Sequence, residues 1–283
     1  MSETGILMKI GSKYFDTAHK SYIMGILNVT PDSFSDGGRF FTGKKLNVDE
    51  ALKTVKRMID EGMDILDVGG ESTRPGYTLI SDDEETERVV PVIEAVRREF
   101  DIPISLDTYK SAVAEAGIKA GADLINDIWG LKYDGKMGEV IARNGLSVCI
   151  MHNRREPNYV NFTEDVLRDR KESLSIAEKA GISRDRIMLD PGVGFAKSRE
   201  QNLEIIRKLD ELCKLGFPVL LGTSRKSVIG LTLDLPVNER LEGTLATTVI
   251  GRMKGASFFR VHDIKENRRV LDMTDAVCGE GGF

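Results

Sequence analysis

The sequence has few of the features that mark secreted proteins or small metal-binding domains. Its 283 residues include only three cysteines, Cys149, Cys213 and Cys278, which show neither a CxxC pair nor the spacing of a zinc site. Cys149 lies in an apolar run and is expected to be a buried small hydrophobe. Such cysteine usage indicates a reducing compartment. We therefore expect a cytoplasmic protein.

Long apolar runs and an excess of positive charge are missing too. No stretch of about 18 apolar residues is present, so no membrane span is expected. Residues 1–6 lack a basic segment followed by an apolar one, so no secretory signal is expected. The net charge of −5 argues against general nucleic-acid binding, which requires a basic face. A small anionic substrate stays compatible with this charge, because a few local cations can bind it.

The remaining composition is that of an ordinary globular protein, with 41% hydrophobic and 30% charged residues. A chain of this length buries a large core and needs no disulfide for stability. Its length could accommodate two domains, but α/β barrels of this length fold as one unit. The sequence therefore predicts a single domain over residues 1–283.

One pattern recurs after a short hairpin that is expected over Ile6–Phe15, with its turn at Gly11 and Ser12. A short apolar run ends in a polar residue, a loop follows, and an amphipathic helical segment comes next. The apolar runs lie at 22–27, 65–66, 102–106, 122–125, 147–151, 187–189, 218–221 and 257–261. The helical segments lie at 48–61, 82–100, 110–120, 136–143, 163–180, 198–215, 238–254 and 264–273.

This pattern predicts an α/β fold. The apolar runs are short and continuous rather than alternating, which is typical of parallel strands covered by helices. Six helical segments end near a glycine, as helix C-termini commonly do: Gly62, Gly121, Gly145, Gly181, Gly216 and Gly255. Eight strand–helix units predict a closed (β/α)₈ TIM barrel, and a doubly wound open sheet is the alternative.

Polar residues stand where the predicted strands end. These residues are Asn28, Asp67, Asp107, Asn126, His152, Asp190 and His262. A single polar residue at such a position can simply cap the following loop or helix. In a barrel, however, all C-terminal strand ends meet at one mouth, where active sites lie. The sequence therefore predicts a binding site at that mouth.

Two long loops follow the first two barrel strands. Residues 28–38, NVTPDSFSDGG, are too rich in Pro, Gly, Asp and Ser to be regular, and form either a lid or an idle surface loop. Residues 67–76, DVGGESTRPG, contain two glycines that let backbone approach a ligand closely. Thr73 and Arg74 in this second loop supply hydrogen-bond donors.

The motif at 190–195, DPGVGF, places a carboxylate and an aromatic ring at one strand end. This pair suits one edge and one face of a planar heterocycle. Asp107, Asn126 and Asp190 together offer acceptors and an amide, a combination that suits a pterin. Each carboxylate can alternatively be a solvated loop acid or a metal ligand.

Two motifs in the last third of the chain suit an anion. Residues 222–227, GTSRKS, run from a strand into a short helix, where backbone N–H groups, Lys226 and Ser227 can bind negative charge. The glycine spacing of a Walker A loop is absent, so a P-loop nucleotide hydrolase is disfavoured. Arg260 and His262 lie two residues apart on one strand, point the same way, and suit a diphosphate.

In this order, the motifs resemble those of the dihydropteroate synthase family over Ile23–Asp263. Residues 25–38 and 67–76 are the most specific, and residues 190–195, 224–227 and 260–263 strengthen the likeness. The resemblance implies condensation of 6-hydroxymethyl-7,8-dihydropterin diphosphate with 4-aminobenzoate, which gives 7,8-dihydropteroate and diphosphate in folate biosynthesis. It also implies Mg²⁺ as cofactor and an SN1-like displacement of diphosphate.

The resemblance assigns roles to the residues at matching positions. The pterin would be held deep in the barrel by Asp107, Asn126, Asp190 and Lys226, with Phe195 near its ring. The diphosphate would be bound by Arg260 and His262, and its Mg²⁺ would be contacted by Asn28. Asp107, Asp190, Lys226, Arg260 and His262 would together form the catalytic set.

The second substrate is assigned to the two long loops and the short helix. Thr73 would contribute substrate contacts from the second loop. The 4-aminobenzoate would be enclosed by Phe34, Arg74 and Pro75, with its carboxylate near Ser227, and sulfonamides would compete there. The resemblance also implies a homodimer formed through the later helices.

Two other interpretations stay open. A methyltetrahydrofolate:corrinoid methyltransferase shares the acid–amide pterin site, but has no use for an anion site at 224–227 or for the Arg260 and His262 pair. A catalytically idle pterin-binding paralogue is a second alternative. The diphosphate and Mg²⁺ positions are all filled in this chain, which argues against it.

Overall fold

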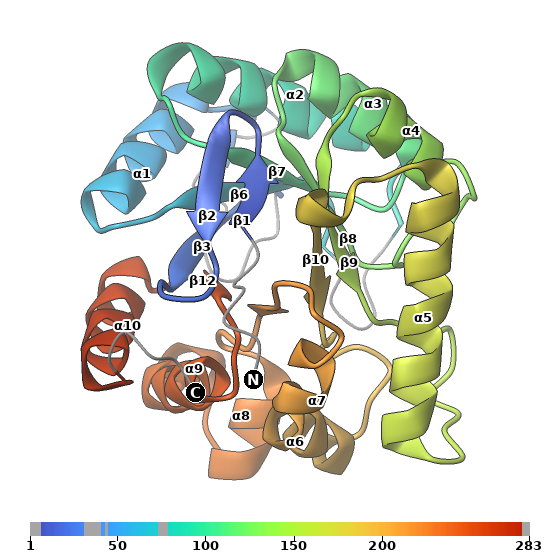
Figure 1. Ribbon diagram of the computed structural model, residues 1–283. Helices are drawn as coiled ribbons and strands as arrows, with labels where there is room; N and C mark the ends of the chain where they lie inside the picture. The colour runs from blue at the N-terminus through green and yellow to red at the C-terminus, as the bar shows by residue number, and fades with distance from the viewer. Residues whose placement is uncertain (1–6, 31–40, 43–44, 73–78, 279–283) are drawn as a thin grey trace.

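The computed structural model of the chain describes residues 7–30, 41–42, 45–72 and 79–278. Within these residues, eight parallel strands form a central ring that helices surround (Figure 1). In chain order these strands are β3 (Tyr22–Asn28), β6 (Ile65–Gly69), β7 (Ile104–Asp107), β8 (Leu124–Asp127), β9 (Ser147–Met151), β10 (Ile187–Asp190), β11 (Leu220–Leu221) and β12 (Phe258–Val261).

The sheet closes on itself. Hydrogen-bonded neighbours follow the order β10-β9-β8-β7-β6-β3-β12-β11. A parallel bridge between Leu189 of β10 and Val219, just before β11, joins the two ends of this order. Closure confirms the predicted (β/α)₈ barrel and excludes the doubly wound open sheet.

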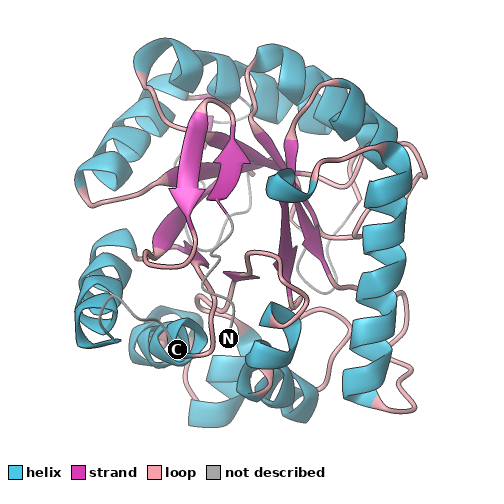
Figure 2. Cartoon of the chain, in the orientation of Figure 1, coloured by secondary structure: helices cyan, strands magenta, loops and turns pink. Residues whose placement is uncertain are grey.

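The helices cover the outside of the barrel (Figure 2). Among the described residues, none of them has both the length and the apolar composition to cross a membrane. The helices are α1 (Val48–Asp60), α2 (Asp82–Glu99), α3 (Ser111–Ala120), α4 (Met137–Arg143), α5 (Phe162–Ala180), α6 (Arg199–Arg207), α7 (Leu209–Cys213), α8 (Ser227–Leu233), α9 (Leu241–Met253) and α10 (Ile264–Cys278). The short 3₁₀ turns η1 (Arg184–Arg186) and η2 (Val237–Glu239) precede β10 and α9.

Local sequence signals explain most helix ends. The six glycines predicted near helix C-termini all have positive φ, which glycine adopts without a steric penalty. The segment predicted as one helix over 198–215 is instead two helices, because the backbone leaves the helical region at Lys208 (φ −104°, ψ 24°). No proline or glycine marks this break. The last helix extends five residues beyond its predicted end at Met273, to Cys278.

A hairpin of β1 (Leu7–Ile10) and β2 (Lys13–Asp16) lies across one end of the barrel (Figure 1). Its buried side chains, Met8, Ile10 and Phe15, form one apolar cluster with residues near the N-terminal ends of the barrel strands. The hairpin therefore covers the end opposite the predicted site. A second antiparallel pair, β4 (Phe41–Thr42) and β5 (Lys45–Leu46), precedes α1.

The barrel interior changes from apolar to polar along the strands. The strand residues that share the hairpin's cluster are Met24, Ile65, Leu124, Cys149, Met188, Leu220 and Phe258. Residues two positions apart on a strand face the same side. Two positions after six of these apolar residues stand Asp67, Asn126, Met151, Asp190, Gly222 and Arg260. The next interior layer is therefore mostly polar, at the end of the barrel where the sequence predicts a site.

Candidate active site

Four positions of the site lie side by side on neighbouring strands. Asn28 of β3 pairs in register with Gly69 of β6, Gly69 with Asp107 of β7, and Asp107 with Asn126 of β8. A Cβ atom built on Gly69 would lie 3.5 Å from Asn28 Oδ1 and 3.8 Å from Asp107 Oδ2. An amide oxygen and a carboxylate oxygen therefore lie on either side of the same glycine.

Arg260 of β12 is held by two carboxylates, which lie on the adjacent strands β6 and β7. Its Nε donates to Asp67 Oδ2 at 2.6 Å, and its Nη2 donates to Asp107 Oδ2 at 2.6 Å. Asp67 is fully buried, and its other oxygen accepts a hydrogen bond from Ser105 Oγ at 2.6 Å. Burial lowers the pKa of Arg260, but Asp67 and Asp107 outweigh this effect and raise the pKa above its ordinary value. A permanent positive charge is thus fixed at the strand end.

Asp107 retains one oxygen for a ligand. Among the described residues, its Oδ1 is buried and has no hydrogen-bond partner. Burial raises the pKa of Asp107 to about 7, against the opposing effect of Arg260. A buried polar atom left without a partner costs roughly 1–3 kcal/mol. A ligand that brings an N–H donor to this oxygen would remove that penalty.

Three charged residues from different elements surround Gly222. A Cβ atom built there would lie 3.7 Å from Arg260 Cβ, 3.8 Å from Asp190 Oδ2 and 3.8 Å from Lys226 Nζ. Glycine keeps the position itself free of a side chain. Burial lowers the pKa of Lys226 to about 8, and the nearby Asp190 opposes this effect. Lys226 is therefore a cation near neutral pH, and it titrates just above that range.

An apolar wall stands beside these charged groups. It consists of Tyr109, Ile128 and Met151, with Trp129 and Phe195 packed against them. Met151 pairs in register with Asp190, so the wall and the carboxylate meet on adjacent strands. The Nζ of Lys226 lies 5.0 Å from the centroid of the Phe195 ring and donates a hydrogen bond to Val193 O. The site thus combines polar groups that can bind the edge of a flat heterocycle with aromatic rings that can pack against its face.

The segment before α8 is tied to the end of β12. The Nδ1 of His262 lies 3.0 Å from Ser224 Oγ, and the backbone N–H of His262 donates to the same oxygen at 3.2 Å. Arg225 donates through Nε to Asp263 Oδ2 at 3.1 Å. These contacts place His262 and the residues before Ser227 at the same mouth of the barrel.

A cavity of about 510 Å³ opens between the loop that follows β10 and the start of α8. Its lining includes Gly194, Lys197, Asn202, Ser227 and Val228. Small-molecule sites typically enclose roughly 300–1,000 Å³. Ser227, predicted to lie near a substrate carboxylate, therefore borders a cavity of suitable size.

The structure places nine of the predicted site residues at the C-terminal mouth of the barrel: Asn28, Asp107, Asn126, Asp190, Phe195, Lys226, Ser227, Arg260 and His262. Phe34, Thr73, Arg74 and Pro75 lie outside the residues that the structure describes. In the described part of the chain, no group of three or more His, Cys, Asp or Glu side chains is arranged to hold a metal ion.

Sequence reasoning missed two residues that organise the site. Asp67 was recognised only as a polar strand end, because its partner Arg260 lies 193 positions away. Lys197 contacts four acceptors around the 190–195 motif, including Gly192 O at 2.9 Å. The one local signal for Lys197 was its position two residues after that motif.

Comparisons with known proteins agree with this geometry. Residues 24–262 match the pterin-binding enzyme family. The chain is 58% identical over 271 residues to a dihydropteroate synthase of Clostridium beijerinckii, and the match covers 95% of this chain and 99% of the relative.

Solved structures are similar over nearly the whole chain. A dihydropteroate synthase from Clostridium difficile, determined in the presence of pteroic acid, is 51% identical with a TM-score of 0.88, covering 93% of this chain and 98% of the other. The enzyme from Xanthomonas albilineans with 4-aminobenzoic acid is 38% identical with a TM-score of 0.89, covering 97% and 98%.

Proposed function

The chain belongs to the pterin-binding enzyme family, among its dihydropteroate synthases, and we propose that the residues at the barrel mouth carry this activity in the roles given below. The enzyme condenses 6-hydroxymethyl-7,8-dihydropterin diphosphate with 4-aminobenzoate in folate biosynthesis. The products are 7,8-dihydropteroate and diphosphate. The observation that carries the residue roles is the buried Oδ1 of Asp107, which has no partner among the described residues, beside the fixed charge of Arg260.

Asp107, Asn126, Asp190 and Lys226 bind the pterin. The amino and ring N–H groups of the pterin are donors, and the carboxylates of Asp107 and Asp190 are acceptors. Lys226 supplies a cation and a donor close to Gly222, as Asp190 supplies an acceptor there. Phe195 contacts the face of the ring, which is supported by its place in the apolar wall.

Arg260 and His262 bind the diphosphate. Arg260 is anchored through Nε to Asp67, so its guanidinium is fixed in direction before substrate arrives. A planar guanidinium forms strong paired hydrogen bonds with phosphate oxygens. His262 reaches the same mouth and is held through Ser224.

Asn28 is proposed to contact the Mg²⁺ that accompanies the diphosphate. Mg²⁺ takes oxygen ligands and is commonly held by one or two protein groups together with substrate phosphates and water. Asn28 Oδ1 lies at the mouth beside Gly69, and an amide oxygen is a ligand type that a hard cation accepts. When bound, Mg²⁺ would supply neutralising charge to the leaving diphosphate.

The 4-aminobenzoate is proposed to enter the cavity beside Ser227, with its carboxylate near the start of α8. Phe34, Thr73, Arg74 and Pro75 would complete the contacts from the two long loops. This arrangement would point the amine of 4-aminobenzoate toward the pterin methylene carbon. Exclusion of water by the loops would favour the amine as nucleophile.

The reaction is a dissociative substitution. The bond between the methylene carbon and the diphosphate oxygen breaks first, and Arg260 and His262 stabilise the charge on the departing diphosphate. The pterin ring delocalises the positive charge left on the methylene group, and Asp107 and Asp190 stabilise it electrostatically. The lone pair of the arylamine then forms the C–N bond, after which the amine loses a proton.

We also propose a cytoplasmic homodimer that forms through the later helices. Large apolar side chains are exposed on α8, α9 and α10: Leu231, Leu233, Ile250, Met253, Met273 and Val277. Exposed apolar surface on adjacent helices is typical of a protein–protein contact. Light scattering at twice the chain mass would support the dimer, and the mass of a single chain would contradict it.

A diphosphate-release assay tests the activity and separates the alternatives. The purified chain, the pterin diphosphate and Mg²⁺ are combined with and without 4-aminobenzoate. Diphosphate release that depends on 4-aminobenzoate supports the function. A pterin that binds without any release would indicate an idle paralogue. Methyl transfer from methyltetrahydrofolate to a corrinoid would indicate the methyltransferase.

A further inference from the structure

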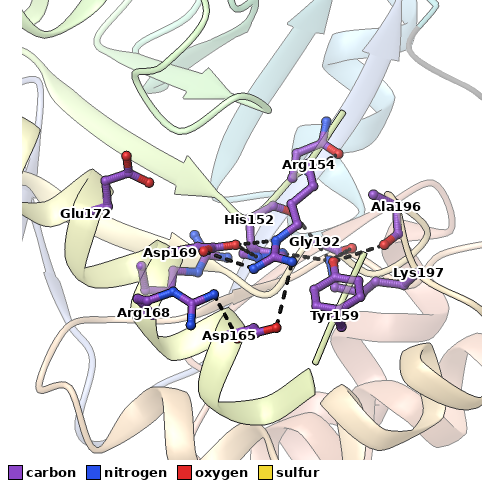
Figure 3. A network of polar contacts seen from close by, with 12 residues as sticks. His152, Arg154, Tyr159, Asp165, Arg168, Asp169, Glu172, Gly192, Ala196 and Lys197 are labelled. Atoms are coloured by element: carbon purple, nitrogen blue, oxygen red, sulfur yellow. Dashed lines mark hydrogen bonds and ion pairs between the residues drawn. The ribbon is translucent and has the colours of Figure 1, made fainter. Parts of the chain in front are cut away.

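Three side chains behind the barrel mouth form a continuous chain of polar contacts (Figure 3). Asp169 lies on α5, His152 directly follows β9, and Lys197 lies in the loop after β10. The distance between His152 Nε2 and Asp169 Oδ2 is 3.0 Å, and that between His152 Nδ1 and Lys197 Nζ is 2.9 Å. None of the roles proposed above uses this chain of contacts.

We infer that Lys197 is a positioning residue of the pterin site, whose ammonium group folds residues 191–197 so that Val193 and Phe195 hold Lys226 in place. This inference rests on the proposed function. The Nζ of Lys197 donates to Gly192 O at 2.9 Å and to Phe195 O at 3.0 Å. Between these two anchored carbonyls lies Val193, whose own carbonyl accepts the hydrogen bond from Lys226.

The backbone of this loop needs such support. Gly192, Gly194 and Ala196 all have positive φ, of 70°, 85° and 45°. For alanine this conformation costs roughly 1–2 kcal/mol. The turn also directs two carbonyl oxygens, those of Gly192 and Phe195, toward one point, where they repel each other unless a donor stands between them. Lys197 provides that donor.

Neighbouring side chains lock the same turn from outside. Tyr159 Oη donates to Ala196 O at 2.9 Å, and Gly194 N donates to Asn202 Oδ1 at 2.6 Å. A Cβ atom on Gly192 would lie only 1.9 Å from His152 O, so a glycine is required where the loop crosses the end of β9. The loop therefore packs closely against the backbone of His152.

The contacts of His152 bear on the protonation state of Lys197. Burial raises the pKa of Asp169, but hydrogen bonds from His152 and Arg154 outweigh it and hold the pKa below its ordinary value. Asp169 is therefore an acceptor, and His152 must donate to it through Nε2. Burial lowers the pKa of His152 to about 3, so the ring is neutral and its Nδ1 can only accept.

Lys197 Nζ then has three acceptors at 2.9–3.0 Å, namely His152 Nδ1, Gly192 O and Phe195 O, and a fourth, His152 O, at 3.5 Å. Burial lowers the pKa of Lys197. A neutral amine, however, has only two N–H donors, whereas an ammonium group has three. The three short contacts match the three donors of the charged form. His152 is fully engaged by Asp169 and Lys197, which makes it a supporting residue rather than a general base.

The test compares Lys197→Met and Asp169→Asn with wild-type enzyme and with Lys214→Met. Methionine keeps most of the length of lysine but donates no hydrogen bond. Lys214 is an exposed lysine that pairs with Glu211, so Lys214→Met removes the same charge at a distant place. Asp169 does not line the cavity near Ser227. It contacts both His152 and Arg154, and Arg154 lies over the Tyr159 ring, so Asp169→Asn acts on the loop through Lys197 and through Tyr159.

Two readouts separate positioning from a purely structural role. The first is KM and kcat for the pterin diphosphate. The second is quenching of Trp129, the single tryptophan, which packs against the same apolar wall as Phe195. We expect Lys197→Met to raise KM and the quenching Kd roughly tenfold or more, a factor that corresponds to about 1.4 kcal/mol. Asp169→Asn is expected to raise both values severalfold, and Lys214→Met to leave them unchanged.

The outcomes distinguish this inference from the function on which it rests. Wild-type enzyme without turnover would overturn the proposed function and the inference together. Normal wild-type turnover with an unchanged KM and Kd in both Lys197→Met and Asp169→Asn would overturn the inference alone. Asp169→Asn preserves side-chain size, so unchanged constants in this variant would overturn the inference even where Lys197→Met does not fold.

Discussion

Nη2 of Arg260 lies 2.6 Å from Oδ2 of Asp107, although 153 positions separate the two residues in the sequence. This contact connects the residue proposed to bind the diphosphate with a residue proposed to bind the pterin. Asp67 holds the other side of the same guanidinium at 2.6 Å. One arginine therefore couples two parts of the substrate site, and its supporting carboxylates can be tested separately.

Asp67→Ala is expected to destabilise the protein, because it leaves the Arg260 guanidinium without its fully buried partner. Breaking a buried ion pair by removing one partner typically costs roughly 3–5 kcal/mol. Urea unfolding measures this loss. Asp210→Ala is the control, since Asp210 forms exposed pairs with Lys214 and Lys254 that are worth roughly 0–1 kcal/mol. Equal free energies of unfolding for the two variants would contradict the described role of Asp67.

Lys226→Ala and Arg260→Ala are each expected to lower kcat by roughly 100-fold or more, the size of effect seen when a group that stabilises transition-state charge is removed. Lys226 would lose its contacts with the pterin, and Arg260 its contact with the diphosphate. Steady-state turnover is measured beside circular dichroism, which reports whether the barrel still forms. Turnover near the wild-type value in both folded variants would refute the assigned roles.

The pH dependence of kcat/KM is expected to be bell-shaped. Asp107 has a pKa of about 7 and must be ionised to accept from the pterin, so activity falls as the pH drops through that value. Lys226 has a pKa of about 8 and must be protonated, so activity falls as the pH rises through that value. Profiles between about pH 5.5 and 9.5 measure both limbs.

Lys226→Arg is the matched variant for the alkaline limb. Arginine stays protonated throughout this range, so the residual activity of the variant should no longer fall near pH 8. The acidic limb, which belongs to Asp107, should remain near pH 7. An unchanged alkaline limb in Lys226→Arg would show that another group titrates there.

Removal of divalent cations is expected to weaken binding of the pterin diphosphate, while binding of a pterin without diphosphate stays unchanged. The reason is that Asn28 lies at the strand end, one strand from Asp107, where its oxygen is proposed to contact a cation on the diphosphate. Fluorescence titration with and without EDTA measures both affinities. Asn28→Ala should raise the Mg²⁺ concentration required. Equal Mg²⁺ requirements in the variant and the wild type would remove Asn28 from the proposed set.

Much of the barrel could be predicted from short-range patterns. The runs that form β3, β9 and β10 ended within one residue of the expected positions, because each is a continuous apolar segment with a polar residue behind it. The break at Lys208 was not predictable, since nothing in the local composition opposes a longer helix. Closure of the barrel through Leu189 and Val219 depends on contacts between distant strands.

The candidate site, like the fold, was predictable only in part. Asp107, Asn126 and Asp190 could be identified because barrel geometry brings every strand end to one mouth. The ion pair between Asp67 and Arg260 could not be predicted, because the two residues meet only after the whole barrel has closed. The role inferred for Lys197 depends on the positive φ angles of Gly192, Gly194 and Ala196, which direct carbonyl oxygens in a way that composition does not reveal.

A crystal structure of the enzyme with 6-hydroxymethyl-7,8-dihydropterin diphosphate and Mg²⁺ tests the central claim most directly. The account predicts that the pterin edge contacts Asp107, Asn126 and Asp190, that Oδ1 of Asp107 accepts an N–H from the ring, and that the diphosphate lies against Arg260. A pterin bound away from the strand ends, with Oδ1 of Asp107 still unpartnered, would contradict it.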